Sequence, residues 1–131
     1  MNDKKLKIGP HWFDLLYVKD LKDDEGNCCL GWCQEDATMI QIEDSMKDTK
    51  RAEVEIHEII HGLLAHTGVI VDAEIEERIV QSLAPILTQF AQDNPVWLHD
   101  WIVRCATTYK QHPPEFKSYH EDYFPIPESE Q

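Results

Sequence analysis

The chain has 131 residues, of which 42% are hydrophobic and 28% are charged, an ordinary composition for one globular domain with a modest core. Its formal net charge of −13 argues against direct binding to nucleic acid or to an anionic membrane surface. No stretch is long enough to span a bilayer and the first residues contain no apolar signal segment, so the sequence predicts a cytoplasmic protein without a membrane partner.

The first third of the chain predicts short β-strands. Alternating and aromatic-rich runs on either side of the turn signal Gly9-Pro10 indicate a strand, a turn and a second strand. A charged loop follows, and then an extended segment in which Trp32 is expected to lie in the core. Three or four strands are therefore expected before the first helix, within residues 6–19, 28–34 and 38–42.

Three helices are expected after the strands, at about residues 51–66, 73–92 and 96–110. Asp48 or Thr49 is the expected cap of the first helix, Asp72 that of the second and Asn94 that of the third. Pro85 lies inside the second helix and predicts a kink. Apolar residues expected to face inward are Ile75, Ile79, Val80, Leu83, Ile86, Leu87 and Phe90 on the second helix, and Trp97, Leu98, Trp101, Ile102 and Cys105 on the third.

The first predicted helix contains the motif H-E-x-x-H, from His57 to His61. Two histidines four residues apart on a helix project from the same face, one turn apart, and can bind one Zn²⁺. Glu58 beside them can act as general base on a water activated by that zinc. The apolar residues around the motif predict that this helix is mostly buried, so that each histidine needs a hydrogen-bond or metal partner. These apolar residues are Ile56, Ile59, Ile60, Leu63 and Leu64.

A hydrolytic zinc needs a third protein ligand. If the helix continues, His66 points away from the two motif histidines, so it is expected to be an ordinary helix-end residue. The acidic start of the next helix offers Glu74, Glu76 and Glu77, of which Glu74 points away from the first helix. Helical geometry alone leaves Glu76 and Glu77 open as the third ligand.

The four cysteines predict no disulfide framework. Cys28 and Cys29 are adjacent, Cys33 follows, and Cys105 lies far away in the sequence, without a C-x-x-C pair. A second zinc site that includes Cys29 and Cys33 is possible by spacing. Reduced, inert thiols are the favoured interpretation.

Between about residues 7 and 95 the sequence resembles the minimal gluzincin metallopeptidases of the ImmA/IrrE type, especially their small phage- and prophage-encoded members. In that family the third ligand is a Glu three residues before a small or aliphatic residue and six before an apolar residue followed by Ala, which here selects Glu77. A second acid directly beside it, Glu76, departs from the family pattern. The stretches that carry the resemblance are Lys7-Ile8-Gly9-Pro10, Tyr17–Leu21, Leu30-Gly31-Trp32, Met39–Ile42, Ala52–His61, Glu76–Pro85 and Asp93-Asn94-Pro95.

The resemblance implies a small zincin-like α+β domain over residues 1–110, with a short N-terminal antiparallel or mixed sheet packed on the H-E-x-x-H helix and two further helices. Residues 111–131 are expected to form a separate tail rich in proline and aromatic residues. In such folds an edge strand can hold an extended peptide by β-augmentation, and residues 38–42 are the candidate strand.

The implied function is that of a zinc metallopeptidase, phage- or prophage-related, acting on a protein or peptide. His57, His61 and Glu77 would hold Zn²⁺, and Glu58 would be the general base. One alternative is a zinc-stabilised binding or regulatory module with little or no peptidase activity, and another is a metallohydrolase of a non-peptide bond. Candidates for the group that stabilises the oxyanion, by residue type alone, are His99, Tyr109, His112 and Tyr119.

Overall fold

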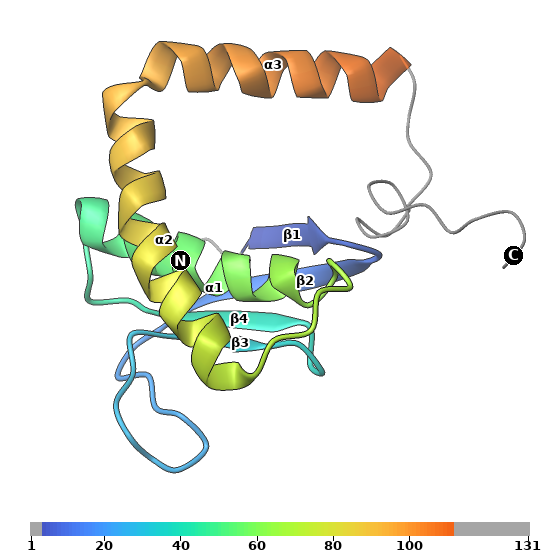
Figure 1. The fold of residues 1–131 in the computed structure, drawn as a ribbon. Coiled ribbons are helices and arrows are strands. Elements are labelled where there is room, and N and C mark those ends of the chain that lie inside the picture. The colour runs from blue at the N-terminus through green and yellow to red at the C-terminus, as the bar shows by residue number, and fades with distance from the viewer. Residues whose placement is uncertain (1–3, 112–131) are drawn as a thin grey trace, which may run out of the picture.

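A computed structural model describes residues 4–111 and shows a small α+β domain with a four-stranded sheet and three helices (Figure 1). Except for Gln111, the tail predicted over residues 111–131 lies outside this described part. None of the helices in it is long and apolar enough to cross a membrane. The elements are β1 (Lys4–Ile8), β2 (His11–Val18), β3 (Gly31–Gln34), β4 (Met39–Glu43), α1 (Asp48–Leu64), α2 (Ala73–Asp93) and α3 (Pro95–Gln111).

The sheet is mixed, with the strand order β1-β2-β4-β3. β1 and β2 form the antiparallel hairpin that Gly9-Pro10 predicted, and Gly9 turns the chain with a φ of 60°. β4 pairs with β2 in parallel and with β3 in antiparallel fashion. The prediction that residues 38–42 are an edge strand is therefore wrong, because the preceding strand β3 folds back along the outer side of β4.

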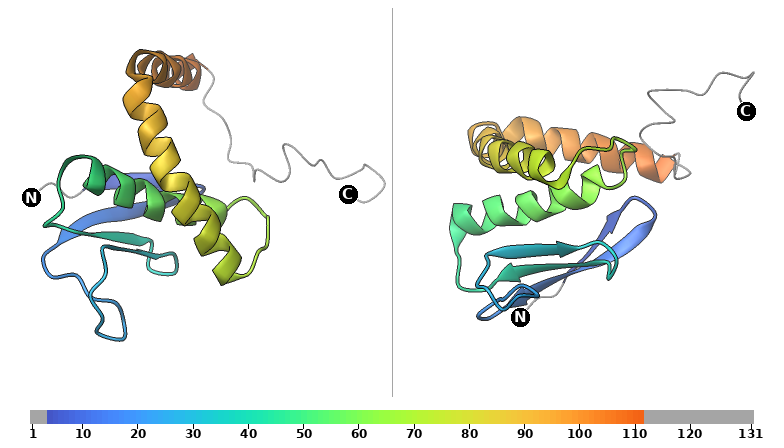
Figure 2. Two further views of the ribbon diagram at one scale, coloured as in Figure 1. Left: turned by 60° about the vertical axis from the view of Figure 1, so that its left-hand side comes forward. Right: turned by 60° about the horizontal axis from the view of Figure 1, so that its bottom comes forward.

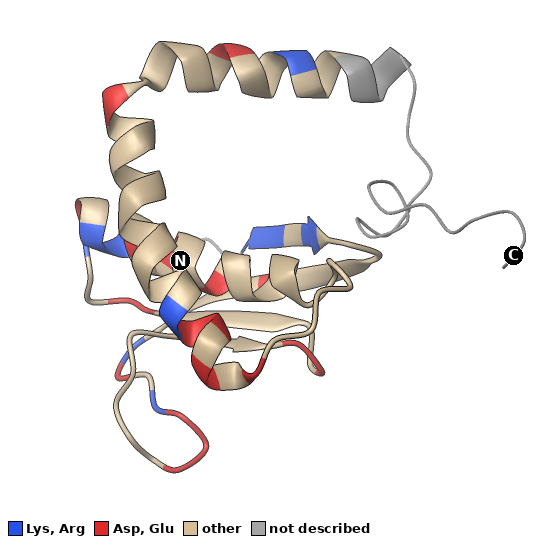
Figure 3. Ribbon diagram, viewed as in Figure 1, with Lys and Arg blue, Asp and Glu red and all other residues tan. Residues whose placement is uncertain are grey.

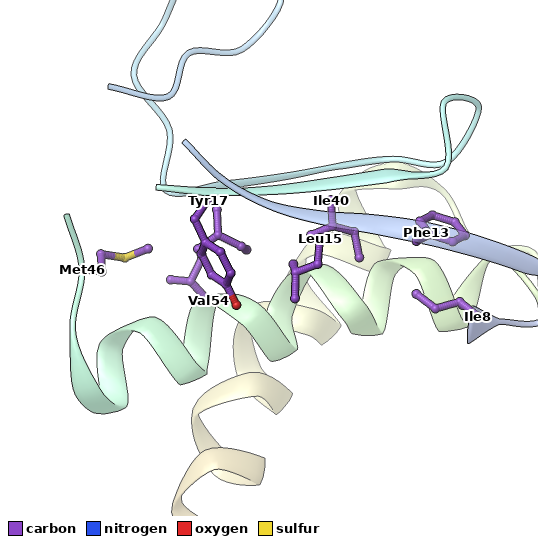
Figure 4. Packing of buried hydrophobic residues seen from close by; sticks show 8 residues of the cluster. Ile8, Phe13, Leu15, Tyr17, Ile40, Met46 and Val54 are labelled. Atoms are coloured by element: carbon purple, nitrogen blue, oxygen red, sulfur yellow. The ribbon is translucent and has the colours of Figure 1, made fainter. Parts of the chain in front are cut away.

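One face of the sheet packs on α1 and forms the main core (Figure 4). Alternation along β2 points Phe13, Leu15 and Tyr17 at the helix, and Ile40 of β4 is fully buried beside them. Trp32 was predicted to lie in this core, but it is only half-buried. The next residue, Cys33, packs against the core instead, because neighbouring residues on a strand face opposite sides.

The start of α1 is fixed to β2 by a polar cluster. The Tyr17 hydroxyl donates to Glu55 at 2.6 Å, and the Arg51 guanidinium lies 3.9 Å from the centre of the Tyr17 ring. The helix begins at Asp48, directly after Lys47, and no side chain caps it, so neither Asp48 nor Thr49 has the predicted role. Contacts with the sheet, rather than a cap, place this end of the helix.

α2 begins as predicted, because the Asp72 carboxylate accepts the Ile75 backbone N–H at 2.9 Å. It continues through Pro85 as one helix and packs on α1, opposite the sheet (Figure 2). This second, smaller core contains Ile60 of α1 with Val80 and Ala84 of α2, and it holds the two helices close together.

Most residues of α2 and α3 that were predicted to face inward are exposed, which is the largest difference from the prediction. α1 covers only one side of the apolar face of α2, and Ile75, Ile79, Leu83, Ile86, Leu87 and Phe90 remain exposed. α3 contacts the end of α2 and extends above the sheet domain (Figure 1). Asn94 holds the predicted N-cap position, because α3 begins at Pro95 and the Asn94 carbonyl accepts the Leu98 N–H, while its side chain donates to the Phe90 carbonyl and also closes α2. The predicted inward residues of α3 are exposed, apart from the half-buried Leu98: Trp97, Trp101, Ile102 and Cys105.

Candidate metal centre

The H-E-x-x-H residues lie where α1 meets both the edge of the sheet and the start of α2. Val54, Glu58 and Gly62 follow each other at helical spacing and form the buried stripe of α1 that faces the sheet. The stripe that faces α2 contains Ile60. His57 and His61 lie between these two stripes, with ring centroids 5.1 Å apart, so they face the gap between β3 and α2.

Glu77 reaches both histidines from the first turns of α2. One of its carboxylate oxygens lies 3.0 Å from Nε2 of His57, and the other lies 3.0 Å from Nε2 of His61. The close packing of Val80 and Ala84 on α1 brings the start of α2 near enough for this contact. One potential ligand atom from each of His57, His61 and Glu77 lies within 4.8 Å of the other two, and this is the cluster of potential metal-binding residues found in the described part of the chain.

The donor set is of a kind that can bind a divalent metal such as zinc. Zinc accepts imidazole nitrogen and carboxylate oxygen, and bonds of about 2.0–2.1 Å in a tetrahedron place neighbouring ligand atoms about 3.3 Å apart. The two contacts of 3.0 Å between Glu77 and the histidines need only small adjustments to reach that spacing. Three protein ligands on one side leave the fourth position open. The residues are therefore compatible with a divalent metal such as zinc.

Glu76, the other open candidate, contacts the opposite side of the His61 ring. Its carboxylate lies 2.6 Å from Nδ1 of His61, so Glu76 and Glu77 hold the two ring nitrogens between them. A hydrogen bond that Nδ1–H donates to Glu76 leaves the lone pair on Nε2, which is the nitrogen turned toward Glu77. Glu77 is therefore placed to share a metal with Nε2 of His61, whereas Glu76 is placed to orient the His61 ring through Nδ1.

Glu58 is buried beside the cluster, with 8% of its surface exposed. Its carboxylate accepts a hydrogen bond from the Cys33 backbone N–H of β3 and lies 3.9 Å from Nε2 of His57. Burial raises the pKa of Glu58 to about 7, although the charge of His61 and the hydrogen bond from Cys33 oppose this shift. The acid is therefore held next to His57, His61 and Glu77 without belonging to their cluster.

The pKa values of the two histidines shift in opposite directions. Burial lowers the pKa of His57, and the neighbouring Glu77 offsets only part of this effect. Burial also lowers the pKa of His61, but the hydrogen bond with Glu76 and the charges of Glu58 and Glu77 outweigh it, so the net shift is upward. The carboxylates around His61 therefore offer a positively charged group a favourable position.

A hollow of about 380 Å³ opens onto the cluster between β3 and the start of α2. A second hollow, also of about 380 Å³, lies along α1 toward Lys50 and shares Gly31, His57 and Glu58 with the first. The two hollows make the site accessible from both ends of β3. The first is lined by Gly31, Trp32, Cys33, Glu35, His57, Glu58, His61, Glu76 and Glu77.

Gly31 lets β3 approach Glu58. A Cβ at this position would lie 2.8 Å from Cγ of Glu58 and 2.9 Å from Cγ1 of Val54, closer than real Cβ contacts. We expect Gly31→Ala to displace Glu58 and to cost about 1–3 kcal/mol of stability. If Glu58 serves a hydrolytic metal centre, hydrolysis should fall about 100-fold, while metal affinity should change little because His57, His61 and Glu77 are untouched.

Parallel measurements of zinc affinity, hydrolysis and thermal unfolding would test this. Gly26→Asn is the control, since an added Cβ meets nothing within 4 Å there and Asn tolerates the positive φ of 81°. Full activity in Gly31→Ala would show that the position of Glu58 does not depend on this glycine.

The remaining candidates lie away from the cluster. The Nδ1–H of His66 donates to the Gly62 carbonyl at 2.9 Å, and its ring lies beside that of His11, as expected of a helix-end residue. Burial raises the pKa of the Cys33 thiol to about 12, and Cys33 joins no metal cluster in the described part of the chain. His99 is exposed on α3, far from the hollows described above. The side chain of Tyr109, and His112 and Tyr119, lie outside the described residues.

The sequence predicted His57, Glu58, His61 and Glu77, and the fold brings these four together. It missed the contact of Glu76 with His61 and the close approach of Gly31 to Glu58. The adjacent acids at positions 76 and 77 were the available signal for the contact between Glu76 and His61. A glycine in a short strand was the available signal for the close approach of Gly31 to Glu58. No protein-family model, no curated protein and no solved structure matches this chain.

Proposed function

We propose that this protein is a zinc metallopeptidase of the minimal gluzincin type, with His57, His61 and Glu77 as metal ligands. The observation that carries the proposal is the convergence of these three residues, from two helices, beside the buried carboxylate of Glu58. The zincin-like character of the fold is part of the same proposal. It is supported by the packing of the H-E-x-x-H helix on a short mixed sheet whose edge strand borders the site.

In this function each residue has a separate task. Bound zinc would supply Lewis-acid polarisation of the scissile carbonyl and would lower the pKa of a water. Glu58 accepts a proton from the attacking water and passes it to the leaving amine. The Cys33 N–H holds one end of the Glu58 carboxylate, which fixes its direction. Glu76 fixes the tautomer and orientation of His61.

The edge strand β3 replaces residues 38–42 as the proposed docking strand for a peptide. Gly31, Trp32 and Cys33 line the hollow at the cluster, and Leu30 and Gly31 line the neighbouring one. An extended peptide along β3 would pass the metal ligands and occupy both hollows. Addition of a strand to an exposed sheet edge is a common way to bind a peptide.

A zinc-stabilised binding module without peptidase activity is the alternative. The setting of Glu58 favours catalysis over this alternative. A structural zinc site has four ligands and needs no unligated acid, whereas here a carboxylate that costs free energy to bury stands 3.9 Å from a ligand nitrogen.

We expect wild-type protein purified without chelators to contain one zinc per chain and to cleave peptides or proteins. His57→Ala should lose both the zinc and the cleavage, because it removes one of three ligands. The measurements are elemental analysis and identification of new N-termini by mass spectrometry in a proteome incubated with the protein.

His99→Ala is the matched control, since this exposed histidine lies on α3, and it should retain zinc and cleavage. Equal zinc content in His57→Ala and wild type would place the metal elsewhere. Zinc without any cleavage would favour the binding module.

A further inference from the structure

A large apolar surface of this domain is uncovered. Among the described residues, six large apolar side chains of α2 and five of α3 are more than a third exposed. At roughly half exposure each, they amount to about 700 Å² of apolar surface summed over both helices. A stable interface buries about 800 Å² on each partner.

The centre of this surface is a groove of about 620 Å³ at the junction of α1, α2 and α3, which we call the apolar corner. Ile56, Phe90, Trp97 and Trp101 line it. Phe90 and Trp97 meet edge to face at 5.8 Å, and Trp97 stacks on Trp101 at 6.3 Å. These contacts fix the aromatic rings, yet Trp97 and Trp101 remain 50% and 47% exposed. The corner is thus ordered before anything binds it.

The same part of the chain carries little charge, although the whole chain carries −13. From Ile79 to His99, Asp93 is the single residue with a formal charge at pH 7, and Asp100 and Arg104, of opposite sign, follow on α3. The charged positions lie mainly on the strands, the loops, α1 and the start of α2, and fewer lie on the rest of α2 and on α3 (Figure 3). Two acidic molecules that approach through α2 and α3 therefore keep most of their like charges apart.

These observations favour a second copy as the occupant. An aromatic surface with few charges resembles the interfaces of obligate homodimers, which are more apolar than transient ones. It also needs a partner that is always present when the chain is made, and another copy meets that condition. A two-fold arrangement pairs the patch with itself and leaves no open end for further growth.

We propose that two copies of this chain form a dimer through α2 and α3, with Trp97 and Trp101 of each copy in the apolar corner of the other. The apolar corner lies at the C-terminal end of α2, whereas Glu77 lies near the start of that helix, and none of the proposed metal ligands lines the corner. Dimerisation and the proposed peptidase activity can therefore be tested independently of each other.

The test is the mass of the full chain by analytical ultracentrifugation over a wide concentration range. We expect a species of twice 15.3 kDa. Trp101→Glu places a charge in the corner and should raise the dissociation constant at least about 30-fold. Trp12→Glu is the matched control: Trp12 is 60% exposed on β2, away from the corner, and the dimer should persist.

Hydrogen exchange of the wild type keeps the proposal testable if Trp101→Glu does not fold. Amides of α3 should be protected in the dimer and should lose protection on dilution, in parallel with the mass. A wild-type chain that is monomeric at all concentrations overturns the proposal. Protected α3 amides in such a monomer would mean that another part of the same chain covers the corner, and a dimer unaffected by Trp101→Glu would place the interface elsewhere.

Discussion

Glu58→Gln should abolish hydrolysis while the protein keeps its zinc. The substitution preserves the shape of the side chain and removes its ability to accept a proton, so the rate should fall by about 10²–10⁴ or more. Glu58 is not among the three residues whose ligand atoms converge, and its carboxylate lies 3.9 Å from Nε2 of His57. Zinc content and affinity should therefore equal those of the wild type.

The measurements are steady-state cleavage of a substrate identified by mass spectrometry and zinc analysis of the same preparation. Because the inactive variant still binds substrate, it should also retain substrate proteins from a lysate that the wild type cleaves and releases. Glu55→Gln is a suitable control, since Glu55 lies on the same helix but contacts Tyr17 rather than the cluster, and its activity should be retained. Full activity in Glu58→Gln would exclude the general-base role.

Glu77→Gln should weaken zinc binding far more than Glu76→Gln. Zinc binding worth about 10–16 kcal/mol over four ligands gives roughly 3 kcal/mol for each, so loss of the Glu77 carboxylate should lower the affinity about 10²–10³-fold. Removal of a group that only orients a ligand costs about 10–100-fold. For Glu76→Gln we expect a loss of zinc affinity near the lower end of this range, about 10-fold, because the amide oxygen can still accept the Nδ1–H of His61.

Competition with a chromophoric zinc chelator measures both affinities on the same scale. Glu74→Gln is the control, since Glu74 is an exposed acid of the same helical turn and should not affect zinc affinity. A larger loss in Glu76→Gln than in Glu77→Gln would reverse the assignment of ligand and orienting residue.

The local features of this protein could be predicted from its sequence. The spacing of His57 and His61 was sufficient to put both rings on one face of a helix, because that depends only on the helical repeat. The hairpin at Gly9-Pro10 and the cap at Asp72 likewise follow from the conformations and hydrogen bonds of neighbouring residues. Such interactions span a few residues, so a single stretch of sequence contains the information that they need.

The division of work between Glu76 and Glu77 depended on tertiary structure. Neighbouring residues on a helix differ by about 100° in direction, and both acids point broadly at α1. The packing of Val80 and Ala84 against Ile60 sets the rotation of α2 about its axis. That rotation places the Glu77 carboxylate between the two Nε2 atoms and the Glu76 carboxylate at Nδ1 of His61.

Strand order and surface exposure also required the fold. The sequence predicted the strand at residues 38–42, but its place inside the sheet depends on β3 folding back beside it. The apolar pattern of α2 and α3 identified which side chains avoid water, yet periodicity does not say what covers them. α1 buries only the Val80 and Ala84 side of α2, and the apolar corner stays open because this part of the chain has no further layer to place on it.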